Sequence, residues 1–199
     1  MRIVDTTEKG LAEAVEALQQ DHVIAYPTET VYGLGCNPFS DAALTKLFKV
    51  KERTGDSPVL MLIGDMAQLN GLAAEVSDQA QRCMDSFWPG PLSLLFPALP
   101  GLNEGIIGPG GKVCVRYTSS TTAANLCCRF GHAITSTSAN ISGEPPAVSC
   151  EGIKIDEVEV CIDGGIIAGQ IPSTVYDPDT DTILREGAIS EKILRTKLA

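Results

Sequence analysis

The sequence lacks any long hydrophobic run, and its longest apolar stretches, such as 91–99, are interrupted by proline. A membrane-spanning helix needs about 20 consecutive apolar residues, so we expect no transmembrane segment and no membrane partner. The opening residues MRIVDTTEKG contain no apolar core of a secretory signal. A chain without such a signal is expected to stay in the cytoplasm.

Histidine is scarce, with two residues, and the seven cysteines form no CxxC pair. A structural zinc site needs four closely spaced ligands, and Cys128 with His132 has no second pair to complete it. An odd number of cysteines, two of them adjacent at 127 and 128, is typical of reduced thiols in a cytosolic protein. We therefore predict no bound metal and no essential disulfide.

Common catalytic signatures are absent, and basic residues are fewer than acidic ones. The sequence contains no GxxxxGK followed by Ser or Thr, which excludes a P-loop, and no GxSxG nucleophile elbow. The glycine-rich GPGGK at 108–112 is interpreted as a turn into a strand. Fifteen Lys and Arg stand against 25 Asp and Glu, giving a net charge of −10. This balance argues against a broad nucleic-acid-binding face, although it permits a local basic pocket.

The 199 residues are 44% hydrophobic and 20% charged, which predicts one domain over 1–199 with a sizeable core. Apolar periodicity predicts helices over 7–20, from Ser40 through 48, and over 77–87, 118–129 and 190–198. Asp5 and Glu8 have the spacing of a capping box for the first helix, and Ser40 and Ser77 are predicted to cap the second and third helices. Strands are predicted over 22–26, 58–63, 112–116, 133–137, 158–162, 173–177 and 182–185. Helices alternating with strands predict an α/β or α+β fold with one mixed, twisted sheet.

Three predicted loops combine small hydroxyl residues, glycines and cations: YPTETVYGLG (26–35), KER (51–53) and STSANISG (136–143). Two of them directly follow predicted strands, where α/β sheets usually bind ligands. Each also has a purely structural explanation, namely a capped turn with glycines at positive φ, cations at a helix end, and a self-satisfied hydroxyl turn. Together they favour a site for phosphate or carboxylate groups.

These loops resemble the YrdC/Sua5 family of threonylcarbamoyl-AMP synthases. AYPTETVYGLG (25–35) resembles the opening signature of the family, FKVKER (48–53) its Lys-x-Arg element, and STSANISGEPP (136–146) its Ser-x-Asn element. Further similar blocks follow the family's order: FWPGPLSLLF (87–96), VCVRY (113–117), PSTVYD (172–177) and LREGAI (184–189). The length is similar to that of the short, single-domain, TsaC-like members.

The resemblance implies a twisted, mostly open mixed sheet with helices around a concave cationic cavity. It also implies an L-threonylcarbamoyladenylate synthase, a nucleotidyltransferase that uses L-threonine, bicarbonate and ATP with Mg²⁺. The products would be threonylcarbamoyl-AMP and pyrophosphate. Partner proteins that modify tRNA would then transfer the threonylcarbamoyl group to adenosine 37.

This reaction needs no protein nucleophile, so we expect catalysis by positioning and electrostatics. Lys51 and Arg53 are the expected catalytic cations, both solvent-reachable in the cavity. The resemblance implies ATP contacts from Lys51, Arg53, Ser138, Asn140 and Arg185. It implies a threonine pocket formed by Thr28, Thr30, Arg116, Ser136 and Ser173. We expect Arg116 to pair with the threonine carboxylate, since a planar fork suits two parallel hydrogen bonds.

Two departures from the family pattern remove rigidity beside cationic residues. Thr54 and Thr118 stand where the family usually has proline. Three alternatives remain open: a double-stranded RNA-binding or ribosome-maturation module with weak RNA contact, a carbamoyl-transferring relative used in hydrogenase maturation, and a YciO-like paralogue with altered activity. The acidic balance argues against the first, and the short chain against the second. The intact Ser-Ala-Asn at 138–140 favours the synthase over the third.

Overall fold

The computed structural model describes residues 1–51, 59–141, 144–168 and 171–198. The strands are β1 (Arg2–Val4), β2 (Val23–Pro27), β3 (Tyr32–Gly35), β4 (Leu60–Ile63), β5 (Leu92–Pro97), β6 (Ile107–Gly108), β7 (Lys112–Tyr117), β8 (Ile134–Ser138), β9 (Val158–Ile162), β10 (Thr174–Asp177) and β11 (Thr182–Arg185). The α-helices are α1 (Glu8–Gln19), α2 (Asp41–Lys51), α3 (Asp78–Phe87), α4 (Thr121–Phe130) and α5 (Glu191–Leu198). Short 3₁₀ turns are η1 (Met66–Gly71), η2 (Glu104–Ile106), η3 (Pro109–Gly111) and η4 (Cys150–Gly152).

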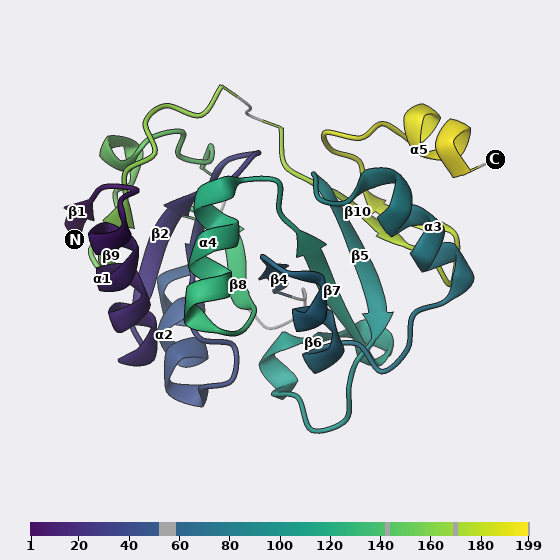
Figure 1. Ribbon diagram of the computed structural model, residues 1–199, viewed down its shortest axis with the longest axis horizontal. Coiled ribbons are helices and arrows are strands. Elements are labelled where there is room, and N and C mark those ends of the chain that lie inside the picture. The colour runs from purple at the N-terminus through teal and green to yellow at the C-terminus, as the bar shows by residue number, and fades with distance from the viewer. Residues whose placement is uncertain (52–58, 142–143, 169–170, 199) are drawn as a thin grey trace.

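In the described ranges the strands form one sheet in the order β1-β9-β2-β3-β8-β4-β7-β5-β10-β11, with β6 pairing β7 (Figure 1). Four neighbouring pairs are parallel: β1 with β9, β2 with β9, β4 with β7, and β5 with β10. The other pairs are antiparallel. This mixed sheet confirms the predicted fold class.

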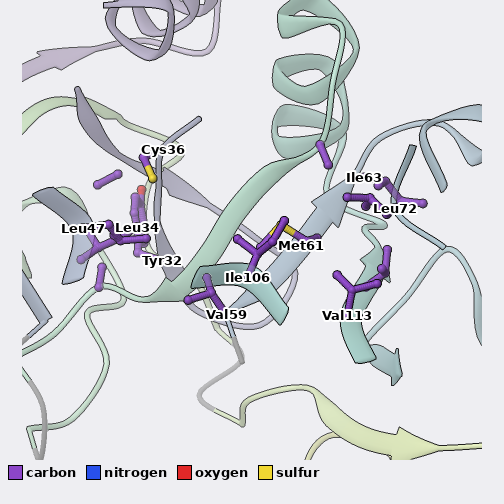
Figure 2. Packing of buried hydrophobic residues seen from close by; sticks show 14 of the residues in the cluster. Tyr32, Leu34, Cys36, Leu47, Val59, Met61, Ile63, Leu72, Ile106 and Val113 are labelled. Carbon is purple, nitrogen blue, oxygen red and sulfur yellow. The ribbon is translucent and has the colours of Figure 1, made fainter. Parts of the chain in front are cut away.

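Helices cover the sheet because each strand presents alternate residues to opposite faces. On β2, Val23 and Ala25 join the larger apolar cluster, which includes Leu47 of α2. Ile24 and Tyr26 join a second cluster beneath α1 and α4. Figure 2 shows part of the larger cluster at β3, β4 and α2. Among the described helices, none is long and apolar enough to cross a membrane.

Two predicted helix caps are confirmed and one is wrong. Ser77 caps α3 by accepting a hydrogen bond from the Ala80 N–H, and the Ser40 hydroxyl at the start of α2 accepts from the Ala43 N–H at 3.3 Å. The cap of α1 is Thr7, whose hydroxyl accepts from the Gly10 N–H at 3.4 Å. Asp5 instead accepts from both the backbone N–H and the hydroxyl of Thr7. The helix therefore begins at Glu8, and the proposed Asp5 capping box does not form.

The strand β3 lies in a segment that the sequence predicted as loop. Its two glycines pack against Tyr26 of β2, so a Cβ at Gly35 would lie 2.7 Å from both Tyr26 Cε1 and the Thr135 carbonyl oxygen. Neither Gly33 nor Gly35 has a positive φ, so that explanation of the two glycines is wrong. They permit close approach inside the sheet, which is a known use of glycine in strands.

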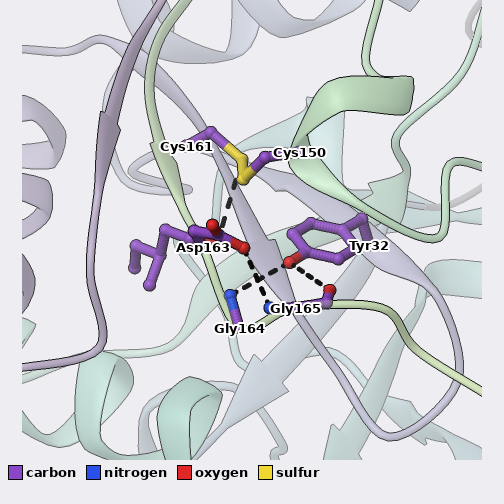
Figure 3. The surroundings of a disulfide bond; sticks show 7 residues. Tyr32, Cys150, Cys161, Asp163, Gly164 and Gly165 are labelled. Atoms are coloured by element: carbon purple, nitrogen blue, oxygen red, sulfur yellow. Dashed lines mark hydrogen bonds between the residues drawn. A yellow bond between two sulfur atoms is a disulfide. The ribbon is translucent and has the colours of Figure 1, made fainter.

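Cys150 and Cys161 form a disulfide, with Cα atoms 6.2 Å apart. This corrects the prediction that the cysteines are all reduced thiols; the remaining five are free. The pairing brings η4 onto β9, a tertiary contact that cysteine spacing does not reveal. Figure 3 shows Tyr32 beside this link, where its hydroxyl donates to the Gly165 carbonyl at 2.9 Å and accepts from the Gly164 N–H at 3.0 Å.

Candidate functional site

A cavity of about 460 Å³ opens on the sheet between the β2–β3 loop and the ends of β8, β10 and β11. Its size lies within the usual range for small-molecule sites. Its lining residues are Thr28, Thr30, Val31, Gly33, Leu60, Ser93, Cys114, Arg116, Ser136, Thr137, Ser138, Pro146, Pro172, Ser173, Val175, Leu184 and Arg185. The five residues of the predicted threonine pocket therefore meet at one place, together with the predicted Ser138 and Arg185.

The alternation of strand residues explains why a polar cavity borders the apolar core. On β8, Ile134 packs beneath α1 and α4, and Ser136 and Ser138 follow on the same face. On β7, Cys114 and Arg116 likewise share one face and line the cavity. One face of the sheet thus changes from covered and apolar to open and hydroxyl-lined.

The β2–β3 loop is held by its own hydroxyl groups. Thr28 Oγ1 donates to the Val31 carbonyl at 2.6 Å and accepts from the Thr30 N–H at 3.1 Å. The hydroxyls of Thr28 and Thr30 lie 3.0 Å apart. This is the structural turn considered from the sequence, and its side chains line the cavity as the functional interpretation required. The two interpretations are compatible.

Arg185 and Ser173 form one corner of the cavity. Arg185 Nη2 donates to the Ser173 carbonyl at 2.9 Å and to its hydroxyl at 3.2 Å. Ser93 Oγ lies 2.8 Å from Ser173 Oγ. Sequence reasoning missed Ser93, although a single hydroxyl within the apolar run LSLLF was a usable signal.

Cys114 lies in the cavity but is not a nucleophile. Burial raises the pKa of its thiol to about 12, although Arg185 and Arg116 act to lower it. A thiol with such a pKa carries almost no thiolate at neutral pH, and thiolate is the reactive form. The site therefore has cations and hydroxyls that could bind anions, and Cys114 only lines the cavity.

Lys51 is placed differently from the sequence-based expectation. Its side chain is buried, at 5% residue exposure, and it is not among the cavity-lining residues. Its Nζ donates to the carbonyls of Ser138 and Asn140 at 2.8 and 2.7 Å, and to Asn140 Oδ1 at 2.8 Å. The expectation of a solvent-reachable Lys51 is therefore wrong, because the ammonium holds the Ser-x-Asn loop. Arg53 and Thr54 lie outside the described residues.

A second hollow of about 430 Å³ lies near His132, at the opposite end of β8 from Ser138. Neither Lys nor Arg lines it, so it offers no cation to a phosphate. Within the described ranges, no three His, Cys, Asp or Glu side chains are grouped so that they could hold a metal ion. The cavity with Arg116 and Arg185 is therefore the candidate site.

A mixed sheet whose hydroxyl-lined cavity contains two arginines has the chemistry of a site for a small anionic ligand. A model of the Sua5/YciO/YrdC family, described as "Telomere recombination", matches residues 16–187, and the chain belongs to this family. This confirms the resemblance drawn from the sequence motifs.

Relatives with known names cover nearly the whole chain. It is 32% identical over 183 residues to a threonylcarbamoyl-AMP synthase of Klebsiella pneumoniae, covering 90% of this chain and 96% of that one. It is 38% identical over 191 residues to a putative threonylcarbamoyl-AMP synthase of Mycobacterium leprae, covering 94% and 86%.

Solved structures share the fold. The crystal structure of P. abyssi Sua5 complexed with L-threonine has a TM-score of 0.91 at 31% identity, covering 98% of this chain and 59% of that longer one. E. coli YciO has a TM-score of 0.83 at 26% identity, covering 94% of each chain.

Proposed function

We propose that the chain is an L-threonylcarbamoyladenylate synthase, a nucleotidyltransferase that uses L-threonine, bicarbonate and ATP. The observation that carries the proposal is the arginine-containing, hydroxyl-lined cavity in a chain similar along its length to proteins of that name. The L-threonine bound to a structure 31% identical to this chain supports the choice of amino acid.

Threonine binding is assigned to the side of the cavity near the β2–β3 loop. Arg116 would pair with the carboxylate, because a guanidinium can donate two parallel hydrogen bonds to it. Thr28, Thr30, Ser136 and Ser173 would supply hydroxyl partners for the remaining polar groups. All of these residues line the one cavity, so they can act on a single molecule.

The reaction requires no covalent bond between the protein and its substrates. The neutral amine nitrogen of threonine attacks the carbon of bicarbonate or carbon dioxide and forms a carbamate. Water is released when bicarbonate reacts, and a proton is released when carbon dioxide reacts. A carbamate oxygen then attacks the α-phosphorus of ATP, while the bond from that phosphorus to the β-phosphate bridging oxygen breaks. Pyrophosphate leaves, and cations stabilise the charge on the phosphate oxygens.

ATP would enter as its magnesium complex. Ser138, Asn140 and Arg185 are assigned to the nucleotide, and Arg53 to the triphosphate. Lys51 would act on the nucleotide through the loop that it holds, because it donates three hydrogen bonds to Ser138 and Asn140. The product would pass to tRNA-modifying partners in the cytoplasm, and the chain would act as one domain over 1–199.

The test is release of pyrophosphate from ATP by the purified chain, with mass spectrometry of the adenylate. Release must require both L-threonine and bicarbonate, and an Arg116→Ala variant should lose it. A folded protein that binds ATP but shows no threonine-dependent release would contradict the synthase and favour a YciO-like activity. Retention on duplex RNA at physiological salt would favour the RNA-binding alternative, because contacts with a nucleic-acid backbone weaken steeply with salt.

A further inference from the structure

Arg116 contacts Glu29, and Glu29 in turn contacts Thr118, and neither of these two residues lines the cavity. Its Nε lies 3.3 Å from Oε1 of Glu29, which follows Thr28 in the β2–β3 loop. The other carboxylate oxygen, Oε2, accepts a hydrogen bond of 2.5 Å from the hydroxyl of Thr118, directly after β7. Neither Glu29 nor Thr118 is among the cavity-lining residues, whereas Arg116 is.

The contact between Glu29 and Arg116 is shielded from water. The side chains are 3% exposed for Arg116 and 13% for Glu29. Glu29 Oε1 and Arg116 Nε are both buried, and neither completes a hydrogen bond within the described part of the chain. Their attraction is therefore mainly between charges, and it is stronger here than it would be in water.

Thr118 in turn is fixed by the backbone around it. Its N–H donates to the Ile63 carbonyl at 3.2 Å, and its hydroxyl oxygen accepts from the Ser120 N–H at 3.1 Å. The Ser120 hydroxyl donates to the Pro27 carbonyl at 3.2 Å, at the end of β2. The end of β7 and the β2–β3 loop are thus joined. Thr118 stands at a position where proline, lacking a hydroxyl, could not make the bond to Glu29.

We propose that Glu29 and Thr118 are positioning residues for Arg116, fixing its guanidinium so that the terminal amino groups face the carboxylate of the substrate. This inference rests on the proposed function, since it concerns recognition of an amino acid. Glu29 occupies the Nε edge, so an incoming carboxylate is received by the two terminal nitrogens. Thr118 prevents the Glu29 carboxylate from rotating away, and bidentate pairing depends on such alignment.

The test separates positioning from general stability by comparing KM for L-threonine with KM for ATP in the pyrophosphate-release assay. Glu29→Gln keeps the shape of the side chain and removes its charge. Thr118→Val removes only the hydroxyl, and Thr118→Ser is the matched control that restores it. We expect KM for L-threonine to rise about tenfold in Glu29→Gln and Thr118→Val. KM for ATP should stay unchanged, and Thr118→Ser should resemble the wild type.

A second measurement asks whether the effect passes through Arg116. In an Arg116→Lys background, which lacks the guanidinium edge, Glu29→Gln should change kcat/KM for L-threonine less than about twofold. Equal effects in both backgrounds would overturn the inference. So would an unchanged or lower KM for threonine in Glu29→Gln, or equal increases in KM for threonine and ATP. If Glu29→Gln fails to fold, the Thr118→Val and Thr118→Ser pair decides by the same readouts.

The inference can fail separately from the proposed function. A wild-type protein that releases pyrophosphate with threonine, beside variants with unchanged kinetics, overturns the positioning role alone. A folded wild-type protein with no threonine-dependent release overturns the proposed function and this inference together.

Discussion

Replacing Lys51 by methionine is the sharpest perturbation of the site. Methionine has a similar length but cannot donate hydrogen bonds, so three oxygens of the Ser-x-Asn loop lose the Lys51 ammonium. Because Lys51 is buried, the variant should lose stability as well as activity. This differs from a cation that meets the substrate in an open cavity, whose removal would leave stability unchanged.

The expected magnitude follows from the three hydrogen bonds. A hydrogen bond from a charged donor contributes about 1.5–3 kcal/mol, but three bonds from one ammonium are not additive. The loop residues Ser138 and Asn140 are only half-buried, so water can replace part of the lost bonding. We therefore expect a loss of about 2–4 kcal/mol in the free energy of unfolding. For a chain of this length, that lowers Tm by about 10 °C.

The assay is urea unfolding together with thermal melting of Lys51→Met, with pyrophosphate release measured on the same samples. Lys46→Met is the matched control, because Lys46 lies on the same helix, is exposed, and donates a hydrogen bond to the Asp21 carbonyl at 2.9 Å. Its effect should stay within about 0.5 kcal/mol. A Lys51→Met protein as stable as the wild type would refute the role of Lys51 in holding the loop.

Three further predictions concern specificity, pH and the disulfide. L-Serine should be disfavoured against L-threonine by about 1–3 kcal/mol in kcat/KM, and Arg116→Lys should weaken threonine binding measured by calorimetry by a larger factor. Burial raises the pKa of the Cys36 and Cys114 thiols to about 12 from an ordinary 9.0, so the native state keeps protons that the unfolded chain loses. Stability should therefore fall as pH rises from 9 toward 12, and a Tm that stays constant there would contradict the assigned burial. Replacing Cys150 and Cys161 by alanine opens a loop of 11 residues and should lower the free energy of unfolding in urea by about 3 kcal/mol. Turnover should be retained, and an inactive but folded variant would show that the disulfide is essential.

The helices and most strands could be predicted because their sequences carry the period of the element. The apolar spacing within α1 and the serine caps of α2 and α3 are local signals, and the structure retains them. β3 could not be predicted in the same way, since its alternating glycines have low strand propensity. They are accepted there because Tyr26 and Thr135 lie too close for a side chain, which only the folded sheet determines.

The cavity residues were predictable as a set, because they lie in the short motifs that resemble those of the family. Their partners were not, because those partners come from distant parts of the chain. Ser93 reaches Ser173 only through the parallel pairing of β5 with β10. Glu29 was not predicted as a site residue, although it lies between the predicted Thr28 and Thr30. Its contact with Arg116 forms only when the whole sheet between β2 and β7 has assembled.

Lys51 and the Ser-x-Asn element lie almost 90 residues apart yet form one physical unit, because Lys51 donates to the Ser138 carbonyl across a sequence separation of 87. The Ser138 hydroxyl also donates to Asn140 Oδ1 at 2.6 Å, so the amide that accepts from Lys51 is fixed on both sides. A change at any of these three residues therefore moves the others. Measured effects of their substitutions should not add, and a double variant at 51 and 140 should cost less than the sum of the two single variants.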